Sequence, residues 1–558
     1  MVFMTFSRNQ AILLIGILSL IFTTILWMTA KAPTQSFIVQ GKDIQSVTRL
    51  IERVGGQITH TLPIIKAIGV NLTKQQKNTL QGYADIRAIY QNRTIKNDYS
   101  KGNDASDLNP DLNYAARIEA DRLHDSNING SGITIAFIDT GIDKKLKNIA
   151  KNIDSDKRLL VQFDAIKNEV DKASSDQSGH GSHVASIATS SEWQKDEENY
   201  TGIAPSANIV SVKAFDDQGK GRYLDVIRAL DWVVSNKDTH NIRVLNLSFS
   251  ADPQSLYWDD PINQAVMVAW QSGIVVVASA GNRGPEAMTI GVPGNVPYII
   301  TVGAMSNNKT SLVTDDILTR FSSSGPTIEG FVKPEIVAPG SRLLGLMKEE
   351  TVIGKAHDDF FSSKNHFAMS GTSQATAVVT GAIALILQQD PSLTPDMVKC
   401  KLMATAQPAL SSEGKLAYSI FQQGAGMINA YEAAHSTEKD CANSLLDIEM
   451  DIQGDQHYAG SARRDQAGNY YIEGTDEYTW DGDYASESGY MWRDGYMWRD
   501  GYMWRDGYMW RDGYMWRDGY MWRDGYMWRD GYMWRDGYMW RDSINDAANI
   551  DVNAWVVD

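Results

Sequence analysis

The sequence predicts an α/β domain with a doubly wound, mostly parallel sheet over residues 110–436. Near-continuous apolar runs alternate there with segments whose apolar residues have helical spacing. Because helices cover both faces of a parallel sheet, its strands are apolar throughout instead of alternating with polar residues. The apolar runs are residues 133–138, 244–249, 274–278 and 298–302, and the helical segments include 223–235 and 262–271. A chain of 558 residues leaves room for further units on both sides of this domain.

The first 32 residues have the pattern of an export signal. No charged residue lies between Arg8 and Lys31, and residues 11–28 are dominated by Ile, Leu, Phe and Trp. We therefore expect an exported protein, either secreted or associated with the cell envelope. A small-x-small sequence at residues 30–32 is typical of cleavage, but a proline follows it, and the run is nearly long enough to span a membrane. A signal peptide and an uncleaved signal anchor both remain open.

Residues 36–97 predict a small α+β unit ahead of the main domain. Strands are expected at 37–39 and 58–63, and apolar residues with helical spacing occupy 44–54. A glycine pair predicts the turn that leads from the helix into the second strand. The polar stretch that follows is rich in Asp and Asn, which predicts a linker or a processing site.

The last part of the chain has a different composition. Residues 437–488 predict an acidic linker, with eleven Asp and Glu residues from 443 onward. Residues 489–542 hold nine copies of the hexapeptide GYMWRD, and residues 543–558 form a short end. The even period suits strand alternation, so two interpretations of this low-complexity tail remain open: a β-rich or aromatic tail that binds the envelope or a partner, and a poorly ordered tail. The net charge of −16 argues against a nucleic-acid-binding protein.

Four short polar motifs follow predicted strands or open predicted helices, where α/β sheets place their active sites. Taken singly, each has an ordinary structural explanation: a carboxylate in a turn, a packed core histidine, a turn asparagine and a helix-capping serine. A metal site is not favoured for the histidines, because no Cys or acidic ligand pattern accompanies them. The motifs are IDTG with Asp139, GHGSHVA with His180 and His183, SAGN with Asn282, and SGTSQAT with Ser373.

Taken together, the motifs resemble those of the subtilisin-like (S8) serine peptidases over most of residues 110–436. The order Asp, His, Asn, Ser is the same, and flanking stretches such as GIAPSA and KPEIVAPG match as well. The resemblance implies a serine endopeptidase that cleaves peptide bonds through an acyl-enzyme. The implied roles are nucleophile for Ser373, general base and acid for His180, orientation of the imidazole for Asp139, and oxyanion donor for Asn282.

The resemblance also implies a substrate-binding cleft. An extended peptide would lie between two backbone segments and place its P1 side chain in a specificity pocket. Because Gly291 is unbranched, a large apolar P1 side chain is expected there. Ser250 and Ala251 stand where the family usually has paired glycines, a departure that bears on the depth of the pocket. The implied positions are Gly221 and Tyr223 in one segment, Ser248, Phe249 and Ser250 in the other, and Ala280 and Gly291 in the pocket walls.

Residues 36–97 resemble the family's inhibitory, I9-like propeptide, which implies self-cleavage between about residues 96 and 110. Proteins or peptides would be the substrates, and the propeptide would be an intramolecular inhibitor. The implied chemistry needs no cofactor, and no structural calcium site can be recognised, although such sites are common in the family. Cys400 and Cys441 either form a disulfide or stay as two thiols, since an exported chain permits both. The alternative function is a surface-binding protein that acts through its aromatic repeat tail, with the α/β domain as a scaffold.

Overall fold

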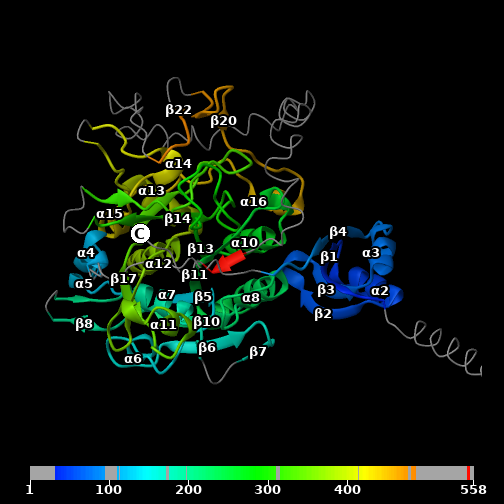
Figure 1. Ribbon diagram of the computed structural model, residues 1–558, viewed down its shortest axis with the longest axis horizontal. Helices are drawn as coiled ribbons and strands as arrows, with labels where there is room; N and C mark the ends of the chain where they lie inside the picture. The colour runs from blue at the N-terminus through cyan, green and yellow to red at the C-terminus, as the bar shows by residue number, and fades with distance from the viewer. Residues whose placement is uncertain are drawn as a thin grey trace, which may run out of the picture. The chain divides into compact units, whose positions relative to one another are not determined.

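The structure is a computed structural model (Figure 1), in which two compact units are distinguished. It describes residues 32–94, 110–111, 113–170, 175–195, 198–308, 315–411, 414–474, 479–484 and 550–552. The first unit is built from Met1–Thr61 and Lys66–Asn92, and the second from Leu62–Ile65 and Arg93–Asp558. The predicted export signal and the hexapeptide repeats lie outside the described residues, as does the predicted processing stretch up to residue 109.

The first unit is the small α+β unit that the sequence predicts. Its four-stranded sheet has the order β2-β3-β1-β4, and β1 is antiparallel to β3 and β4. Asp43 caps the first helix, and Gly55 ends it in the left-handed conformation, with φ of 75°. Apolar side chains of the sheet and of this helix form the core. The elements are β1 (Gln35–Gly41), α2 (Ile44–Val54), β2 (Gln57–Leu62), β3 (Ala67–Leu72), α3 (Lys74–Gln81) and β4 (Ile86–Gln91).

A nine-stranded sheet forms the centre of the second unit. Its order is β15-β14-β13-β11-β5-β10-β6-β7, with β16 also paired to β14. Six of its pairings are parallel, and only the edge strands β15 and β7 are antiparallel to their neighbours. The predicted doubly wound, mostly parallel sheet is therefore confirmed. The strands are β5 (Thr134–Asp139), β6 (Leu159–Asp164), β7 (Glu169–Val170), β10 (Asn208–Lys213), β11 (Ile242–Leu247), β13 (Val275–Ser279), β14 (Ile300–Ser306), β15 (Ile317–Leu318) and β16 (Ile336–Pro339).

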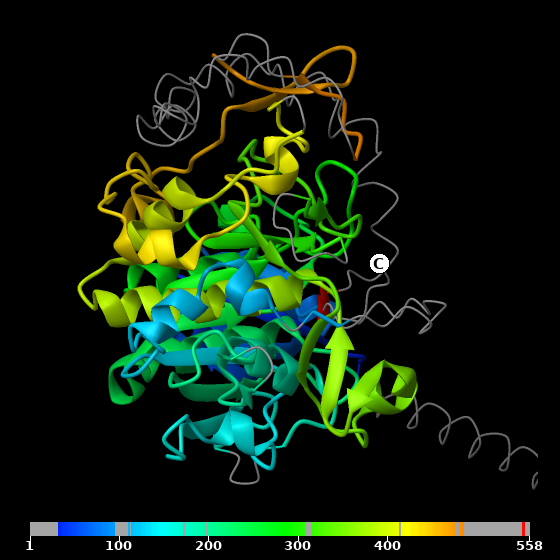
Figure 2. The same ribbon diagram turned by 90° about the vertical axis from the view of Figure 1, so that its left-hand side faces the viewer.

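Two pairs of helices pack on this sheet (Figures 1 and 2). Helix α12 (Thr372–Gln389) packs against α7 (His180–Thr189) and across β11, β13 and β14. Helices α8 (Tyr223–Ser235) and α10 (Pro261–Gln271) pack together and contact β5 and β13, respectively. The remaining helices are α4 (Tyr114–Arg117), α5 (Asp121–Asp125), α6 (Lys147–Ala150), α9 (Lys237–His240), α11 (Val352–Ala356), α13 (Pro395–Thr405), α14 (Ile420–Gln423), α15 (Ala430–His435) and α16 (Ile448–Gln453).

Short sheets surround the central one. Cys400 on α13 and Cys441 are joined by a disulfide, which answers the question that the sequence left open. No helix within the described ranges is long and apolar enough to cross a membrane. The outer strands are β8 (Trp193–Gln194), β9 (Asn199–Tyr200), β12 (Phe249–Ala251), β17 (Leu343–Leu346), β18 (Phe361–Ser363), β19 (His366–Met369), β20 (Ala462–Arg464), β21 (Tyr470–Ile472), β22 (Thr479–Trp480) and β23 (Ile550–Val552).

The segment predicted as an acidic linker is largely a packed part of the second unit. It contains α16 and the sheet β20-β21-β22, which lies beside α14 in both ribbon views. Trp480 is buried and stacks on Phe421 of α14. Asp451 is buried as well, and its Oδ2 accepts hydrogen bonds from the hydroxyls of Tyr257 and Tyr298 at 2.6 and 2.9 Å. The linker prediction is wrong for these residues. Aromatic side chains such as Trp480 give the segment enough apolar surface to pack on the second unit, and a count of its charged residues does not reveal that surface.

Candidate active site

Asp139 and His180 form a buried pair at the carboxyl end of the sheet. Asp139 is the last residue of β5, and His180 is the first residue of α7. His180 Nδ1 lies 2.8 Å from Asp139 Oδ1 and 3.0 Å from Oδ2, and the Thr140 backbone N–H donates to Oδ1 at 2.7 Å. A carboxylate can only accept, so it holds the imidazole with its proton on Nδ1. The other ring nitrogen, Nε2, is buried with no hydrogen-bond partner among the described residues and is left as a proton acceptor.

The start of α7 is fixed by a carboxylate that the sequence analysis did not single out. Asp176 Oδ1 accepts from the Gly179 N–H and the Thr140 hydroxyl at 2.9 Å each, and Oδ2 accepts from the Ser182 N–H at 2.8 Å. Burial raises the pKa of the Asp176 carboxyl. Because Thr140 directly follows Asp139 and Gly179 directly precedes His180, Asp176 ties the two chain segments of the pair together. The signal that could have revealed it is an acidic residue four positions before His180, just ahead of a helix start.

Ser373 is the second residue of α12. It is buried in the first turn, where the backbone N–H groups have no intrahelical acceptor and the helix dipole favours negative charge. Its hydroxyl donates to the Ser248 carbonyl at 3.1 Å. Ser373 and His180 are not hydrogen-bonded to each other, and His180 Nε2 has no partner within the part of the chain that the structure describes.

Asn282 lies in the loop after β13 and contacts the same helix start. Its Oδ1 accepts from the Thr372 backbone N–H at 3.0 Å and from the Thr372 hydroxyl at 2.9 Å. These two donors fix the orientation of the carboxamide, since the amide nitrogen could not accept from either of them. Nδ2 is thereby left as a buried donor with no hydrogen-bond partner in the described part of the chain. Thr372 is the second residue that sequence reasoning missed.

His183 is separate from this group. It is fully buried in the middle of α7, and its Nε2 lies 2.9 Å from the Phe367 carbonyl oxygen. Burial lowers the pKa of His183 to about 4. His183 is thus a packed core histidine, which is the structural explanation given above as the alternative to a metal ligand. No group of three or more His, Cys, Asp or Glu side chains arranged to hold a metal ion is found among the described residues.

The two predicted substrate-binding segments lie along this site. Ser248 separates β11 from β12, and it exchanges hydrogen bonds with Ser373 through both its carbonyl and its hydroxyl. Strand β12, which contains Phe249 and Ser250, is paired antiparallel with β23. In the other segment, Gly221 packs against the Phe215 ring, where a Cβ would lie 2.9 Å from ring carbons.

The side chain of Tyr223, in the segment that also contains Gly221, is buried, so only its backbone is available to contact a neighbouring strand. Its ring is buried, its hydroxyl donates to Asp260 at 3.0 Å, and burial raises the pKa of that hydroxyl. The Tyr223 N–H donates to the carbonyl of Arg93, and the neighbouring Arg222 forms an antiparallel bridge with Thr94. Both segments therefore have extended chain beside them.

Ala280 and Gly291, the predicted wall residues of the specificity pocket, are neighbours in the structure. The Gly291 N–H donates to the Ala280 carbonyl at 3.2 Å, so the two predicted wall residues do come together. A Cβ on Gly291 would lie 1.9 Å from Ser250 Oγ and 3.0 Å from Arg283 Nη2. On the side of Gly291 where a Cβ would project, the space is thus occupied by polar groups of other residues. The expected preference for a large apolar P1 residue stays a prediction.

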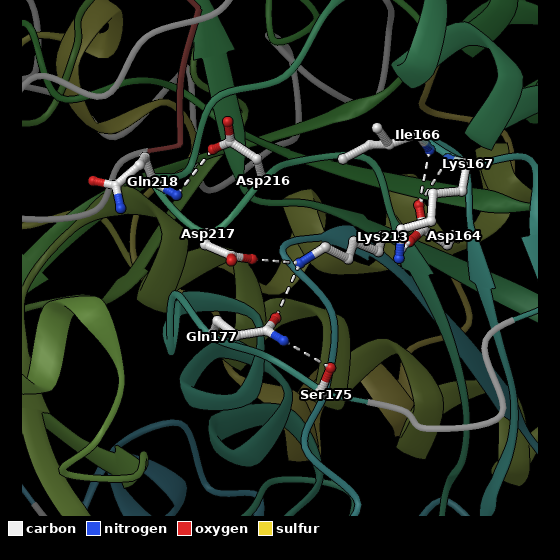
Figure 3. A pocket seen from close by; sticks show the side chains of 9 residues that line it. All are labelled: Asp164, Ile166, Lys167, Ser175, Gln177, Lys213, Asp216, Asp217 and Gln218. Carbon is white, nitrogen blue, oxygen red and sulfur yellow. Dashed lines mark hydrogen bonds and ion pairs between the residues drawn. The ribbon is translucent and has the colours of Figure 1, made fainter.

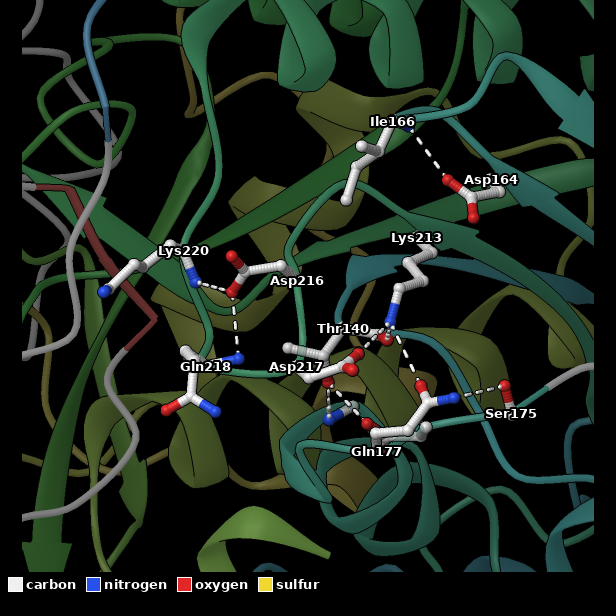
Figure 4. A network of polar contacts seen from close by, with 12 residues as sticks. Thr140, Asp164, Ile166, Ser175, Gln177, Lys213, Asp216, Asp217, Gln218 and Lys220 are labelled. Carbon is white, nitrogen blue, oxygen red and sulfur yellow. Dashed lines mark hydrogen bonds and ion pairs between the residues drawn. The ribbon is translucent and has the colours of Figure 1, made fainter.

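A polar pocket of about 490 Å³ is lined by residues at the ends of β6 and β10 and in the loops that follow β6, precede α7 and follow β10 (Figure 3). Lys213 at the end of β10 donates to the Thr140 carbonyl and to Asp217 at 3.1 Å each, and to Gln177 at 3.4 Å (Figure 4). Its ammonium group thus links the three loops that follow β5, precede α7 and follow β10. The pocket is lined by Asp164, Ile166, Lys167, Ser175, Gln177, Lys213, Asp216, Asp217 and Gln218.

Comparisons with known proteins identify the family of the chain. Residues 130–427 match the family model described as the subtilase family, Peptidase_S8. The chain is 35% identical over 352 residues to serine protease AprX of Bacillus subtilis (strain 168), which covers 62% of this chain and 74% of that protein. It is 28% identical over 445 residues to subtilisin E of the same organism, covering 77% of this chain and 99% of subtilisin E.

A solved structure shows the same fold. It is that of fervidolysin from Fervidobacterium pennivorans, described as a keratinolytic enzyme related to subtilisin, with a TM-score of 0.55 and 23% sequence identity. The match covers 74% of this chain, which spans 62% of the length of fervidolysin. The family match, the two relatives and the shared fold lead to one conclusion: the chain belongs to the subtilase family of subtilisin-like serine peptidases, whose substrates are proteins or peptides.

Proposed function

We propose that this protein is an exported serine endopeptidase in which Asp139, His180 and Ser373 form the catalytic triad and Asn282 stabilises the oxyanion. The observation that carries the proposal is a pair of buried groups without hydrogen-bond partners among the described residues: the acceptor His180 Nε2 at the start of α7, and the donor Asn282 Nδ2 beside the start of α12. Buried polar groups without partners are costly, at about 1–3 kcal/mol each, and their occurrence is explained if a reacting substrate satisfies both.

The first step is acylation. The Ser373 hydroxyl turns from the Ser248 carbonyl toward His180 Nε2, and Oγ attacks the carbonyl carbon of the substrate while its proton passes to Nε2. The carbonyl electron pair moves to oxygen, and Asp139 stabilises the imidazolium that forms. His180 then returns the proton to the amide nitrogen as the C–N bond breaks, which leaves the acyl-enzyme. Water repeats the sequence in the second half, with His180 again as base and then acid.

The oxyanion is held by two donors. Asn282 Nδ2 supplies one, and the Ser373 backbone N–H at the start of an 18-residue helix supplies the other. Each proton transfer and each charge is thus assigned to a group of the chain, so the proposed mechanism requires no cofactor.

Substrate would bind as an added strand. Support comes from β12, whose edge takes an extended segment of this chain, Ile550–Val552, in antiparallel register with Phe249–Ala251. On the other segment, Arg222 is bridged to Thr94 in the same antiparallel manner. Main-chain hydrogen bonds of this kind bind a peptide without regard to its sequence, which suits an endopeptidase.

Maturation and export complete the proposal. Residues 36–97 act as an inhibitory propeptide, and the enzyme cleaves itself between about residues 96 and 110. The support is the small α+β unit, followed at once by chain that pairs beside the proposed substrate segment at Thr94. Export is supported by the uncharged apolar run at residues 11–28, and a secreted and an envelope-associated protein both remain candidates.

A fluorophosphonate probe tests the catalytic assignment. After removal of the propeptide, the probe is expected to label Ser373, and Ser373→Ala is expected to lose labelling and peptide hydrolysis. A folded, processed protein that is not labelled would overturn the proposal. For maturation, Ser373→Ala expressed in a protease-free host is expected to stay unprocessed, and the appearance of the normal fragment would contradict self-cleavage.

A further inference from the structure

The last strand of the chain pairs with the proposed substrate-binding strand. β23 (red in Figures 1 and 2) lies antiparallel to β12, so that Ile550–Val552 runs beside Phe249–Ala251 with Asp551 opposite Ser250. The two strands are far apart in the sequence, and their pairing is a tertiary contact. An extended peptide that bound to β12 as an added strand would need the edge that β23 occupies.

The other edge of β12 is paired within the catalytic domain. The Phe249 carbonyl accepts from the Ser279 hydroxyl at 3.0 Å. The Ala251 N–H and carbonyl form hydrogen bonds of 2.9 and 2.8 Å with the backbone of Val292. Successive residues of a strand direct their backbone groups to opposite neighbours. The backbone groups of Ser250, which lies between Phe249 and Ala251, are therefore directed to β23.

The edge that faces β23 leads to the proposed nucleophile. By the same alternation, the backbone of Asp551 pairs with Ser250, whereas the N–H of Ile550 is directed away from β12. The carbonyl of Ser248, two residues before Ser250, accepts from the Ser373 hydroxyl at 3.1 Å. Because the pairing is antiparallel, β23 runs in the direction that leads toward Ser248. The acyl part of a substrate would run in the same direction, so the inference rests on the proposed function.

The other predicted substrate-binding segment is paired by a different part of the chain. Thr94 forms an antiparallel bridge with Arg222, which lies between Gly221 and Tyr223. The proposed self-cleavage would detach Thr94 together with the propeptide. Ile550–Val552 would remain part of the mature enzyme, so the pairing on β12 would outlast maturation.

We propose that Ile550–Val552 is an intramolecular inhibitor of the mature enzyme, which holds the β12 edge as a substrate would and must leave before a peptide can bind. The tether, residues 485–549, is long enough at up to about 3.3 Å per residue for the segment to leave β12 and return. Because inhibitor and enzyme are one chain, the occupancy of the edge does not depend on the enzyme concentration. Substrate affinity is then reduced by the fraction of molecules in which the edge is open.

Proline substitutions in β23 of the full-length mature enzyme test the inference. Asp551→Pro removes the N–H that pairs with Ser250, and Ile550→Pro is the matched control because its N–H is directed away from β12. We expect Asp551→Pro to lower KM for an extended peptide substrate at least fivefold, with kcat within twofold. Such a change corresponds to a segment that occupies the edge in about four-fifths of the molecules. Ile550→Pro should stay within twofold of the parent in both constants, and an equal fall in its KM would contradict the pairing.

Deletion and addition of the segment give an independent measurement. Deletion of residues 543–558 is expected to lower KM as Asp551→Pro does. A synthetic peptide of residues 543–558 is expected to raise KM again without changing kcat, and the same peptide with Asp551→Pro should inhibit at least fivefold more weakly.

Three outcomes would count against the proposals. Unchanged KM in both Asp551→Pro and the deletion variant, each fully labelled at Ser373 by the fluorophosphonate probe, would overturn the inference alone. Absence of labelling would instead overturn the proposed function. Release of the segment by self-cleavage, detected by mass spectrometry of the full-length mature enzyme, would show that it is a substrate and would overturn the inhibitory role.

Discussion

Replacing Asn282 by alanine tests the oxyanion assignment most directly. Nδ2 is buried and has no partner in the described structure, so a hydrogen bond that it forms with the oxyanion is gained in the transition state without breaking another one. Loss of one preorganised oxyanion donor of this kind typically costs about 2.7–4 kcal/mol, or a factor of roughly 10²–10³ in kcat. We expect Asn282→Ala to lower kcat by that factor, with KM changed by less than about threefold.

The control for this prediction comes from the other end of the same side chain. Asn282 Oδ1 accepts from both the backbone and the hydroxyl of Thr372. Thr372→Val removes only the hydroxyl donor, so the carboxamide is still oriented by the backbone N–H, and kcat should fall by no more than about tenfold. Steady-state kinetics with a peptide substrate, normalised to the fraction of enzyme labelled at Ser373, give both values. If Asn282→Ala kept kcat within tenfold of the parent, or if it raised KM alone, Nδ2 would not be an oxyanion donor.

Three further predictions concern the support of the site. Asp176→Ala removes the acceptor of three hydrogen bonds that join the Asp139 and His180 segments, and should lower the free energy of unfolding by about 2–4 kcal/mol in urea titrations; a smaller loss than that of an exposed Asp→Ala control would contradict the role. The Cys400–Cys441 disulfide closes a loop of 41 residues, so the Ala double variant should lose about 2–4 kcal/mol, and a stability unchanged by reduction would count against this. His183 has a folded pKa of about 4 against 6.5 when unfolded, so the unfolded state binds the proton first on acidification. Stability should therefore fall between pH 6.5 and 4 by roughly 3 kcal/mol, and a His183→Gln variant that showed the same fall in its melting temperature would refute this source.

Local patterns predicted much of the main fold. The apolar run at 133–138 became β5, one residue later, and the helical segment at 223–235 became α8 without change. The run at 244–249 is divided, because Ser248 turns toward Ser373 and separates β11 from β12. An apolar run indicates that a segment is buried, but it does not indicate where the backbone leaves one sheet and begins to pair with a different strand.

For the acidic segment, the sequence analysis failed to predict burial. Its charge count predicted a linker, whereas Asp451 and Trp480 are buried in the second unit. Composition averages over a segment, and burial is decided by individual partners. The two hydroxyls that bind Asp451 come from residues more than 150 positions away in the sequence, Tyr257 and Tyr298, so no local pattern contains them.

The sequence by itself determined the family and the identity of the four groups proposed for catalysis, because the chemistry requires those residue types and each is set in a distinctive short motif at a strand end or helix start. It could not show the hydrogen bonds of those groups or the packing around Gly291. That Ser373 donates to Ser248, that Asn282 is oriented by Thr372, and that Ser250 fills the space beside Gly291 are decided only by the tertiary structure. The physical reason is that catalysis depends on residue type and local position, whereas specificity depends on volumes and hydrogen bonds shared between segments that meet only in the folded chain.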